Sequence, residues 1–275
     1  MSEVQPATLR HSYARRIAQL ADTRNARIEQ AFSEIPRETF LPPSPWTVIS
    51  LGDVRQTDEL ADIYDNVLVA IDRKRGINNG EPALHAGWLD AVSPQPGDHV
   101  IHVGAGTGYY TALLARLVDP GGSVEAFEYE SDLADIASRN LQPYANVVVH
   151  SGSAFGRELS QADIIYVNAG VTAPDPKWLK ALKRGGRLVF PWRPHGGWGP
   201  ALLVTRQERG FAVHFLMNVG FISCSGAAEK LKPRHRLTET AATTVRSVWL
   251  TGDAAPDRSA VAIYEHVWFS SMSLG

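Results

Sequence analysis

The chain of 275 residues has few of the features that would define a secreted or membrane-spanning protein. Cys224 is the only cysteine, so a disulfide within the chain is impossible, and the composition fits a reducing cytoplasm. No apolar run reaches the roughly 20 residues that span a bilayer, and the N-terminus lacks the apolar core of a signal peptide. The nine histidines are scattered without a Cys–His cluster, so no metal site is expected.

Charge of one sign is also lacking. The sequence has 27 Lys and Arg against 29 Asp and Glu, which gives a formal net charge of −2. This balance gives no electrostatic reason to expect nucleic acid or an anionic membrane as a partner. Hydrophobic residues make up 44% and charged residues 20%, as in globular proteins with a sizeable core. We therefore expect a cytoplasmic protein with one large domain or one domain with additions.

The first 95 residues mix helical and irregular patterns. Apolar residues at helical spacing predict amphipathic helices over 8–21 and 25–35. Prolines 42, 43 and 45 and a stretch without period predict an irregular loop over 41–62, such as a lid or substrate wall. A short strand over 67–71 and a helix that buries Leu84, Trp88, Leu89 and Val92 follow.

From residue 99 strands and helices alternate, which predicts a mostly parallel sheet with helices on both faces. Strands are predicted at 99–103, 123–128, 147–150, 163–167 and 187–190, and helices at 109–118, 132–140 and 176–183. Predicted helix boundaries are an N-cap at Ser131, an N-cap and N1 proline at Asp175-Pro176, and a C-terminal stop at Gly185-Gly186.

The end of the chain changes character again. Two apolar segments, 201–205 and 211–219, flank a polar turn and predict an antiparallel hairpin. Residues 229–240 are basic and polar and predict a linker, and 246–250 and 261–269 predict a small β extension. We divide the chain into N-terminal helices with a substrate-side loop (1–75), a central domain (76–228) and a C-terminal extension (229–275).

A glycine loop follows the strand at 99–103. Gly104, Gly106 and Gly108 stand at every second position and precede an apolar segment with helical spacing. Strand, glycine turn and helix together form a nucleotide pocket in α/β folds, because glycine allows close backbone approach and the helix presents free N–H groups. The spacing differs from the dinucleotide pattern G-x-G-x-x-G, since the third glycine comes one residue early.

An acidic residue follows the next predicted strand. Glu128 lies 24 positions after Gly104, close to the roughly 20 residues that separate a glycine loop from a ribose-binding acid. In a right-handed β-α-β unit both strand ends open onto one crevice, where a carboxylate accepts hydrogen bonds from ribose hydroxyls. The alternative is a solvated carboxylate that caps the next helix.

From about residue 25 to 226 the sequence resembles the protein-L-isoaspartate O-methyltransferases. Residues 35–42 resemble the family pattern V-P-R-x-x-F-V-P, residues 64–66 its Y-x-D stretch, and residues 82–86 its P-H-M-H-A segment. Residues 182–191 resemble L-K-x-G-G-R-L-V-x-P, and residues 221–223 fall where the family carries F-V-P. The two N-terminal segments, 35–42 and 82–86, distinguish this family from other methyltransferases.

This resemblance implies a Rossmann-like, doubly wound α/β fold, S-adenosyl-L-methionine (SAM) as cofactor, and a carboxylate of an isoaspartyl or aspartyl residue in a protein or peptide as acceptor. The residues that it implies for cofactor binding are His102, Gly104, Ala105, Gly106, Thr107, Gly108, Tyr109, Glu128, Tyr129, Gly152, Ser153 and Asn168.

The sequence departs from the family at three positions. Gly80 stands where the family's T-I-S-x-P segment has a serine at the methyl-transfer site. Ser153 stands in place of the aspartate in G-D-G that meets the adenine amino group, and His102 in place of the acid that often precedes the loop. The substituted serine leaves open whether the acceptor is still an isoaspartyl carboxylate.

The candidate acceptor-site residues are Asn78, Asn79, Gly80, Glu81 and His85. A carboxylate acceptor has a pKa near ~4 and is already ionised, so it needs alignment and desolvation rather than a base. A hydroxyl or amine acceptor would need a base, for which Glu81 and His85 are candidates; alternatively they are a turn residue and a surface residue. Asn78 and Asn79 could donate N–H bonds to a carboxylate or tolerate left-handed turn geometry.

Two further hypotheses remain beside isoaspartyl methylation. The first is a methyltransferase with another acceptor, a different peptide or a small molecule. The second is a SAM-binding module without transferase activity, which the altered acceptor loop favours and the intact glycine loop opposes.

Overall fold

The computed structural model describes residues 5–50, 52–194, 198–224, 234, 237 and 239–274. The chain forms two compact units, each of which is described by itself. Unit 1 comprises Met1–Gly97, Ala105–Val124 and Glu130–Val149, and unit 2 comprises Asp98–Gly104, Glu125–Tyr129 and His150–Gly275. The division at residues 75 and 228 stays a prediction. Among the described residues, no helix has the length and apolar character needed to cross a membrane.

Helices dominate unit 1. They are α1 (Pro6–Leu20), α2 (Ala26–Glu34), the 3-10 helix η1 (Arg37–Phe40), α3 (Leu60–Ile63), α4 (Pro82–Val92), α5 (Tyr109–Val118) and α6 (Ser131–Asn140). The Asn25 side chain accepts a hydrogen bond from the Arg27 N–H at the start of α2, which satisfies one of the free donors of the first turn. The helices predicted at 8–21, 25–35 and 109–118 are confirmed. The predicted N-cap at Ser131 is wrong, because Glu130 occupies that position.

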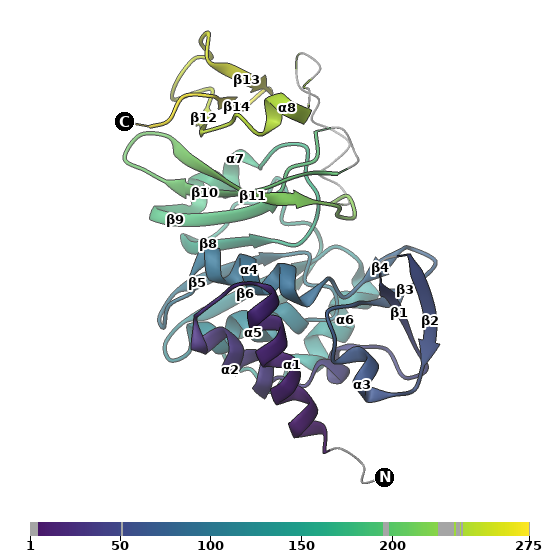
Figure 1. Ribbon diagram of the computed structural model, residues 1–275. Coiled ribbons are helices and arrows are strands. Elements are labelled where there is room, and N and C mark those ends of the chain that lie inside the picture. Colours follow the sequence, from purple (N-terminus) through teal and green to yellow (C-terminus); the bar gives the residue numbers. More distant parts are fainter. Residues whose placement is uncertain are drawn as a thin grey trace. The chain divides into compact units, whose positions relative to one another are not determined.

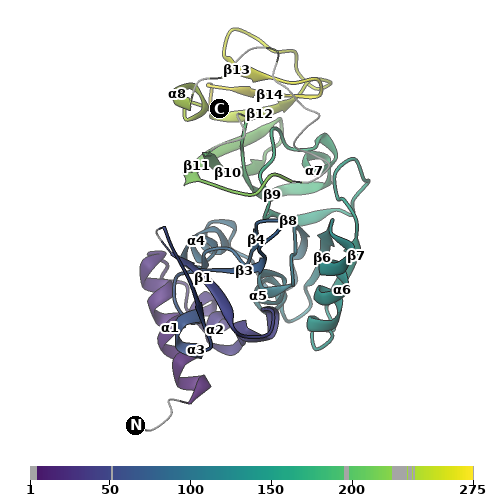
Figure 2. The same ribbon diagram turned by 90° about the vertical axis from the view of Figure 1, so that its right-hand side faces the viewer.

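A four-stranded sheet completes unit 1 and overturns the prediction of an irregular loop over 41–62. Its strands are β1 (Trp46–Ser50), β2 (Asp53–Thr57), β3 (Leu68–Asp72) and β4 (Ile77–Asn78), in the order β2-β1-β3-β4. The β1–β2 hairpin forms because Thr47, Val48 and Ile49 are β-branched, with Thr47 and Val48 buried, and Gly52 takes a positive φ at the turn. Figure 2 shows this sheet together with α3.

Unit 2 is built on a ten-stranded sheet. All ten strands lie in unit 2, except that the first residues of β6 and β7 belong to unit 1. The strand order is β13-β14-β12-β11-β10-β9-β8-β5-β6-β7. The bounds are β5 (His99–Val103), β6 (Ser123–Glu128), β7 (Val147–Ser151), β8 (Ala162–Val167), β9 (Leu182–Pro191), β10 (Gly199–Arg206), β11 (Phe211–Val219), β12 (Ser247–Leu250), β13 (Ala260–Ile263) and β14 (Val267–Ser270).

The sheet is mixed. Strand β8 pairs in parallel with β5 and β9, whereas every pair from β9 to β13 is antiparallel. The α/β class and the β10–β11 hairpin are therefore confirmed, but the antiparallel part is larger than predicted. The C-terminal strands extend the same sheet (Figure 1), and the segment 261–269 is two strands that turn between Tyr264 and Val267. Most of the predicted linker at 229–240 lies outside the described residues.

The connection between α7 (Pro176–Ala181) and β9 corrects another prediction. The Asp175 carboxylate accepts from the Lys177 N–H at 2.8 Å, which confirms the N-cap. However, Gly185-Gly186 does not end this helix, because β9 already begins at Leu182. The two glycines lie in an irregular part of the β8–β9 pairing, where a Cβ on Gly186 would come within 2.7 Å of the Lys183 carbonyl oxygen.

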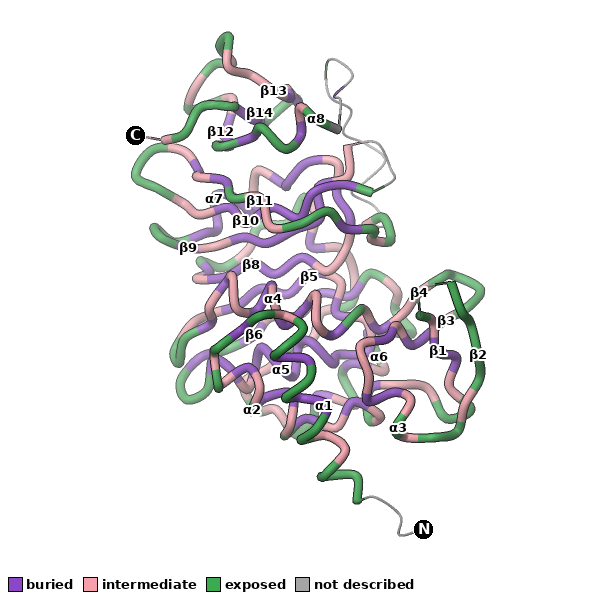
Figure 3. The backbone as a smooth tube through the Cα atoms, in the orientation of Figure 1, coloured by how far each residue is buried: buried purple, intermediate pink, exposed green. Residues whose placement is uncertain are grey.

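The core of unit 2 lies along its central strands, where buried residues follow one another (Figure 3). Trp192, which follows β9, stacks on Phe269 of β14 with ring centroids 4.2 Å apart. Its indole N–H also donates to the Thr172 carbonyl at 2.8 Å. The C-terminal strands are thus packed into the core of unit 2, since large aromatic rings contribute much of the buried apolar area.

Candidate functional site

In unit 2 the carboxyl ends of neighbouring strands meet at one edge of the sheet. Three backbone hydrogen bonds join the residues that follow them: Gly104 N to Phe127 O at 2.8 Å, Asn168 N to Val103 O at 2.8 Å, and Gly152 N to Glu128 O at 2.7 Å. The carboxyl edge of an open α/β sheet is where such folds bind nucleotides. The structure therefore brings Gly104 and Glu128 to one edge, as their spacing predicts, and places Gly152 and Asn168, which the family resemblance implied, at the same edge. We call this part of the sheet the glycine edge.

Glu128 is the acid at this edge. It ends β6 and is 7% exposed, whereas its neighbour Tyr129 is 52% exposed. Gly104 has φ +81°, and a Cβ there would lie 3.3 Å from the Asn168 carbonyl oxygen, so this turn needs glycine. Burial, and then the Glu128 charge, raise the pKa of the Cys224 thiol to about 11, which keeps the thiol protonated beside the carboxylate.

Two residues at this edge are those that the resemblance aligns with acids of the family. His102 in β5 is fully buried, and burial lowers the pKa of its imidazole to about 3, so the ring is neutral near pH 7 and supplies no charge. The Ser153 hydroxyl oxygen accepts from the Phe155 N–H at 3.0 Å. Its proton and second lone pair remain for a ligand, because a hydroxyl has one donor and two acceptor sites.

The rest of the glycine loop, 105–108, belongs to unit 1. Gly106 and Gly108 have φ +58° and +103°, and Gly108 is the N-cap of α5. A Cβ on Gly108 would lie 2.9 Å from Leu141 Cδ1. The Thr107 hydroxyl donates to the Phe40 carbonyl at 2.5 Å, and Tyr109 is 1% exposed among aromatic rings. The side chains of Thr107 and Tyr109 are thus used internally, and the loop offers a ligand its backbone.

The candidate acceptor loop, 78–81, lies in unit 1. The Asn78 side-chain oxygen accepts from the Gly80 N–H at 2.9 Å, and the Asn79 side-chain oxygen accepts from Arg37 Nε at 3.0 Å. Neither asparagine has a positive φ, so the interpretation that they tolerate left-handed geometry is wrong. Gly80 takes that conformation, with φ +77°.

His85 packs against this loop. It is fully buried, so the alternative of a surface residue is wrong. Its ring stacks on Tyr110 of α5 with centroids 3.6 Å apart, and the Tyr110 hydroxyl donates to the Gly80 carbonyl at 3.3 Å. A Cβ on Gly80 would lie 2.6 Å from His85 Nε2. The sequence pattern pointed to His85 but not to Tyr110, which only the packing of α4 on α5 brings to the loop.

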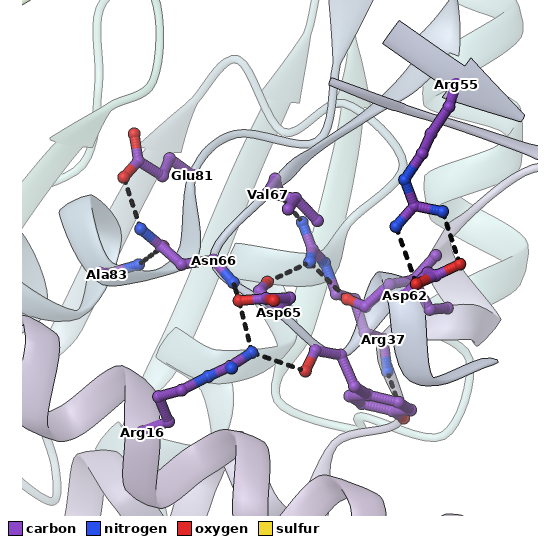
Figure 4. A network of polar contacts seen from close by, with 11 residues as sticks. Arg16, Arg37, Arg55, Asp62, Asp65, Asn66, Val67, Glu81 and Ala83 are labelled. Atoms are coloured by element: carbon purple, nitrogen blue, oxygen red, sulfur yellow. Dashed lines mark hydrogen bonds and ion pairs between the residues drawn. The ribbon is translucent and has the colours of Figure 1, made fainter. Parts of the chain in front are cut away.

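Arg37 is a further residue at this loop that the sequence reasoning did not assign to the site. The residue is fully buried, and the guanidinium donates to five oxygens: Asn79 Oδ1 at 3.0 Å and the carbonyls of Ile63 at 2.6 Å, Asp65 at 3.1 Å, Val67 at 2.7 Å and Gly80 at 3.4 Å. Figure 4 shows Arg37 with two of these acceptors, Asp65 and Val67. The planar fork of arginine suits several fixed acceptors at once, so Arg37 holds the acceptor loop against residues 63–67. The motif over 35–42 was the available signal.

Glu81 is exposed, and its carboxylate is held by Asn66, which lies in the same segment 63–67 that Arg37 contacts. Asn66 donates from Nδ2 to Glu81 Oε1 at 2.6 Å and accepts at Oδ1 from the Ala83 N–H at 2.8 Å (Figure 4). The second bond satisfies a free donor in the first turn of α4. Only an amide can make both bonds, because an aspartate has no proton to donate to Glu81.

The fold and the residues at the glycine edge together indicate the class of protein. The chain has an α/β fold of the kind found in SAM-dependent methyltransferases. The sequence profile of the protein-L-isoaspartate(D-aspartate) O-methyltransferase family matches residues 14–229, and the chain belongs to this family. A Methanothrix thermoacetophila protein-L-isoaspartate O-methyltransferase is 31% identical over 221 residues, 77% of this chain and 94% of that protein. The Thermotoga maritima enzyme of this name is 29% identical over 216 residues, 76% of this chain.

Solved structures agree on the fold. A protein-L-isoaspartate O-methyltransferase superposes with a TM-score of 0.71 and 22% identity over 94% of this chain and 86% of that chain. A Plasmodium falciparum protein described as such a methyltransferase, in complex with S-adenosyl-L-homocysteine, gives 0.64 and 18% identity over 78% of this chain and 98% of that chain. The sequence match spans only 64% of the Thermotoga maritima protein.

Proposed function

We propose that this chain transfers a methyl group from SAM to the carboxylate of an isoaspartyl or aspartyl residue in a protein or peptide. The observation that carries the proposal is the family match over residues 14–229, which includes both the glycine edge and the acceptor loop. The single cysteine supports placement in a reducing compartment such as the cytoplasm.

The residues at the strand edge fit SAM. Glu128 would accept hydrogen bonds from the ribose hydroxyls, Gly104 and Gly106 would allow close backbone approach, and Ser153 would meet the adenine amino group. The positive φ values of both glycines and the Cβ contact at Gly104 support this assignment. His102, Ala105, Thr107, Gly108, Tyr109, Tyr129, Gly152 and Asn168 complete the proposed set. SAM supplies a sulfonium that makes its methyl group electrophilic.

The chain's own task is to position an acceptor that is already reactive. A carboxylate is ionised at neutral pH, so its alignment and desolvation supply the rate enhancement. In our proposal residues 78–81 form the surface that receives the acceptor, and Arg37, His85 and Tyr110 fix the shape of that surface. Arg37 therefore acts as a positioning residue, since its hydrogen bonds go to the loop and to residues 63–67.

A changed acceptor is the second candidate function. The observation that favours it is Gly80, which offers no hydroxyl where the family has serine. Here Glu81 would serve as the base for a hydroxyl or amine, because Asn66 holds its carboxylate in place at 2.6 Å.

The chemistry of the product separates these functions. Purified protein is incubated with SAM and an isoaspartyl peptide, and the methylated product is then held at alkaline pH. A methyl ester is hydrolysed there: it takes up water, releases methanol and returns to the starting mass, which supports carboxyl methylation. A product that keeps its methyl group indicates a methylated amine or ether and contradicts the proposal.

A further inference from the structure

A cavity lies in unit 2 at the sheet edge opposite the glycine edge. It has a volume of about 760 Å³ and is lined by Arg184, Gly185, Arg206, Gln207, Glu208, Arg209, Trp249, Ser273 and Leu274. In the parallel pairing of β8 with β9, Ala162 faces Leu182 at the amino ends of both strands. Arg184 and Gly185 lie two and three residues after Leu182, whereas the residues proposed for SAM follow the carboxyl ends. This cavity is therefore a second site.

The cavity is basic although the chain as a whole is not. Three arginines and one glutamate line it, a local charge of about +2 in a protein of net charge −2. Guanidinium groups bind carboxylates and phosphates through two parallel hydrogen bonds, which a lysine cannot do. The lining thus selects an oxyanion.

One arginine is fixed in place before any ligand arrives. Arg206 Nη1 donates to the Lys180 carbonyl at 3.0 Å and also to the Leu182 carbonyl. Fixing a long side chain in advance reduces the entropy lost on binding. Arg184, in contrast, pairs with Glu208 at 3.4 Å, and these side chains are 73% and 77% exposed. An exposed pair of this kind contributes little stability, so a ligand carboxylate can replace Glu208.

The opposite wall is a rigid indole. The Trp249 ring packs on Gly210, where a Cβ would lie 3.1 Å from the ring, and lies parallel to Trp268 at 6.1 Å. Its N–H donates to Ser247 Oγ at 3.1 Å. This wall provides an apolar surface for the methylene groups of a peptide. Trp249, Ser273 and Leu274 all lie beyond residues 14–229, so the C-terminal strands build this wall outside the family match.

We propose that this cavity binds an acidic segment of a protein, with aspartate or glutamate carboxylates on Arg184, Arg206 and Arg209 and the intervening chain on Trp249. The local charge of about +2 in the cavity matches two carboxylates. The carboxylate of Glu208, which also lines the cavity, would repel the closely spaced phosphates of a nucleic acid. The inference rests on geometry outside the transfer site and stands independently of the acceptor's identity.

The test is binding of a dye-labelled hexaglutamate peptide, followed by fluorescence anisotropy at low salt. We expect saturable binding that weakens at least tenfold in the double variant Arg184→Gln, Arg209→Gln and weakens as salt is raised. Arg258→Gln, which removes an exposed arginine in the turn before β13, is the matched control and should bind as the wild type does. Hexalysine should not bind.

Three results would overturn the inference. These are no binding of hexaglutamate at millimolar concentration, equal binding by the double variant, and competition by pyrophosphate that is far stronger than by unlabelled hexaglutamate. The last would identify a site for small phosphates. Because the measurement is binding, a failure of methyl transfer would leave its result unaffected.

Discussion

The Nε2 atom of His85 lies 2.6 Å from the point where a Cβ on Gly80 would stand. Real Cβ atoms do not approach a ring nitrogen so closely, and the stacked Tyr110 ring at 3.6 Å prevents a simple retreat of His85. Gly80, which the resemblance aligns with the family's serine, is therefore part of the packing of this loop, and a side chain cannot be added there without moving His85.

We expect Gly80→Ser to destabilise the fold by about 1–3 kcal/mol and to lower methyl transfer, because it adds both a clash and left-handed strain. Urea unfolding and initial rates measure the two effects. Gly76→Ala is the control for strain alone, since Gly76 has φ +69° and nothing within 4 Å of its Cβ position. A Gly80→Ser variant that is no less stable than Gly76→Ala would contradict the clash.

We expect Arg37→Lys to cost about 3 kcal/mol in unfolding free energy, because one ammonium cannot reach the acceptors on both segments. At a temperature where the variant is folded, the KM for the acceptor peptide should rise at least tenfold while SAM affinity stays unchanged. Arg27→Lys is the matched control, because Arg27 also donates to two carbonyls, those of Pro94 and Leu117, away from the acceptor loop. An equal rise in KM in both variants would mean that Arg37 stabilises the fold but does not position the acceptor loop.

Much of the fold could be predicted because its signals are local. The strand at 99–103, the helix at 109–118 and the strand at 123–128 follow from apolar periodicity and have the predicted bounds. The β1–β2 hairpin was missed because its strands are short and the burial of their residues does not alternate along the chain. The C-terminal strands were predicted as strands, but their place in the large sheet depends on long-range pairing that no sequence period encodes.

The candidate site divides in the same way. The glycine loop and Glu128 are separated by a fixed number of residues, so their common edge follows from β-α-β geometry. Arg37 and Tyr110 act through burial and through contacts across tens of residues, 43 positions in the case of Arg37 and Gly80. An arginine motif therefore indicated family membership without revealing the contacts that the residue makes.

We expect Gly106→Val to abolish SAM binding in calorimetry. Gly106 has φ +58°, a conformation that a β-branched residue avoids, and only Ile71 Cδ1 lies within 4 Å of its Cβ position, at 3.8 Å. The added side chain would therefore occupy space that is free of protein and that we assign to the cofactor. Gly76→Val is the control for backbone strain and should keep wild-type affinity. Unchanged affinity in Gly106→Val would refute the assignment of the loop.

Stability should depend on pH through His102. Burial lowers the pKa of His102 from 6.5 to about 3, so below pH 6.5 the unfolded chain takes up a proton that the folded chain does not. The free energy of unfolding should therefore fall as the pH drops from 6.5 toward 3, by at most about 1.4 kcal/mol per pH unit from this residue. Above pH 6.5 this contribution should be constant.

Denaturant titrations of wild type and His102→Asn at several pH values test this expectation. The stability difference between the two proteins should shrink or change sign in favour of the variant as the pH falls from 6.5 to 4.5. His11→Asn, in which an exposed histidine of α1 is replaced, should follow the wild type. A wild-type-to-His102→Asn difference that is constant over this range would mean that His102 is not buried as a neutral ring.

Methyl transfer from SAM to a peptide with one isoaspartyl residue tests the central claim most directly, with the normal aspartyl peptide of the same sequence as control and mass as the readout. Our account predicts a product heavier by one methyl group from the isoaspartyl peptide, formed despite the glycine at position 80, and the aspartyl peptide shows whether the normal linkage is also accepted. No product from either peptide, in a sample where calorimetry shows that SAM is bound, would contradict it.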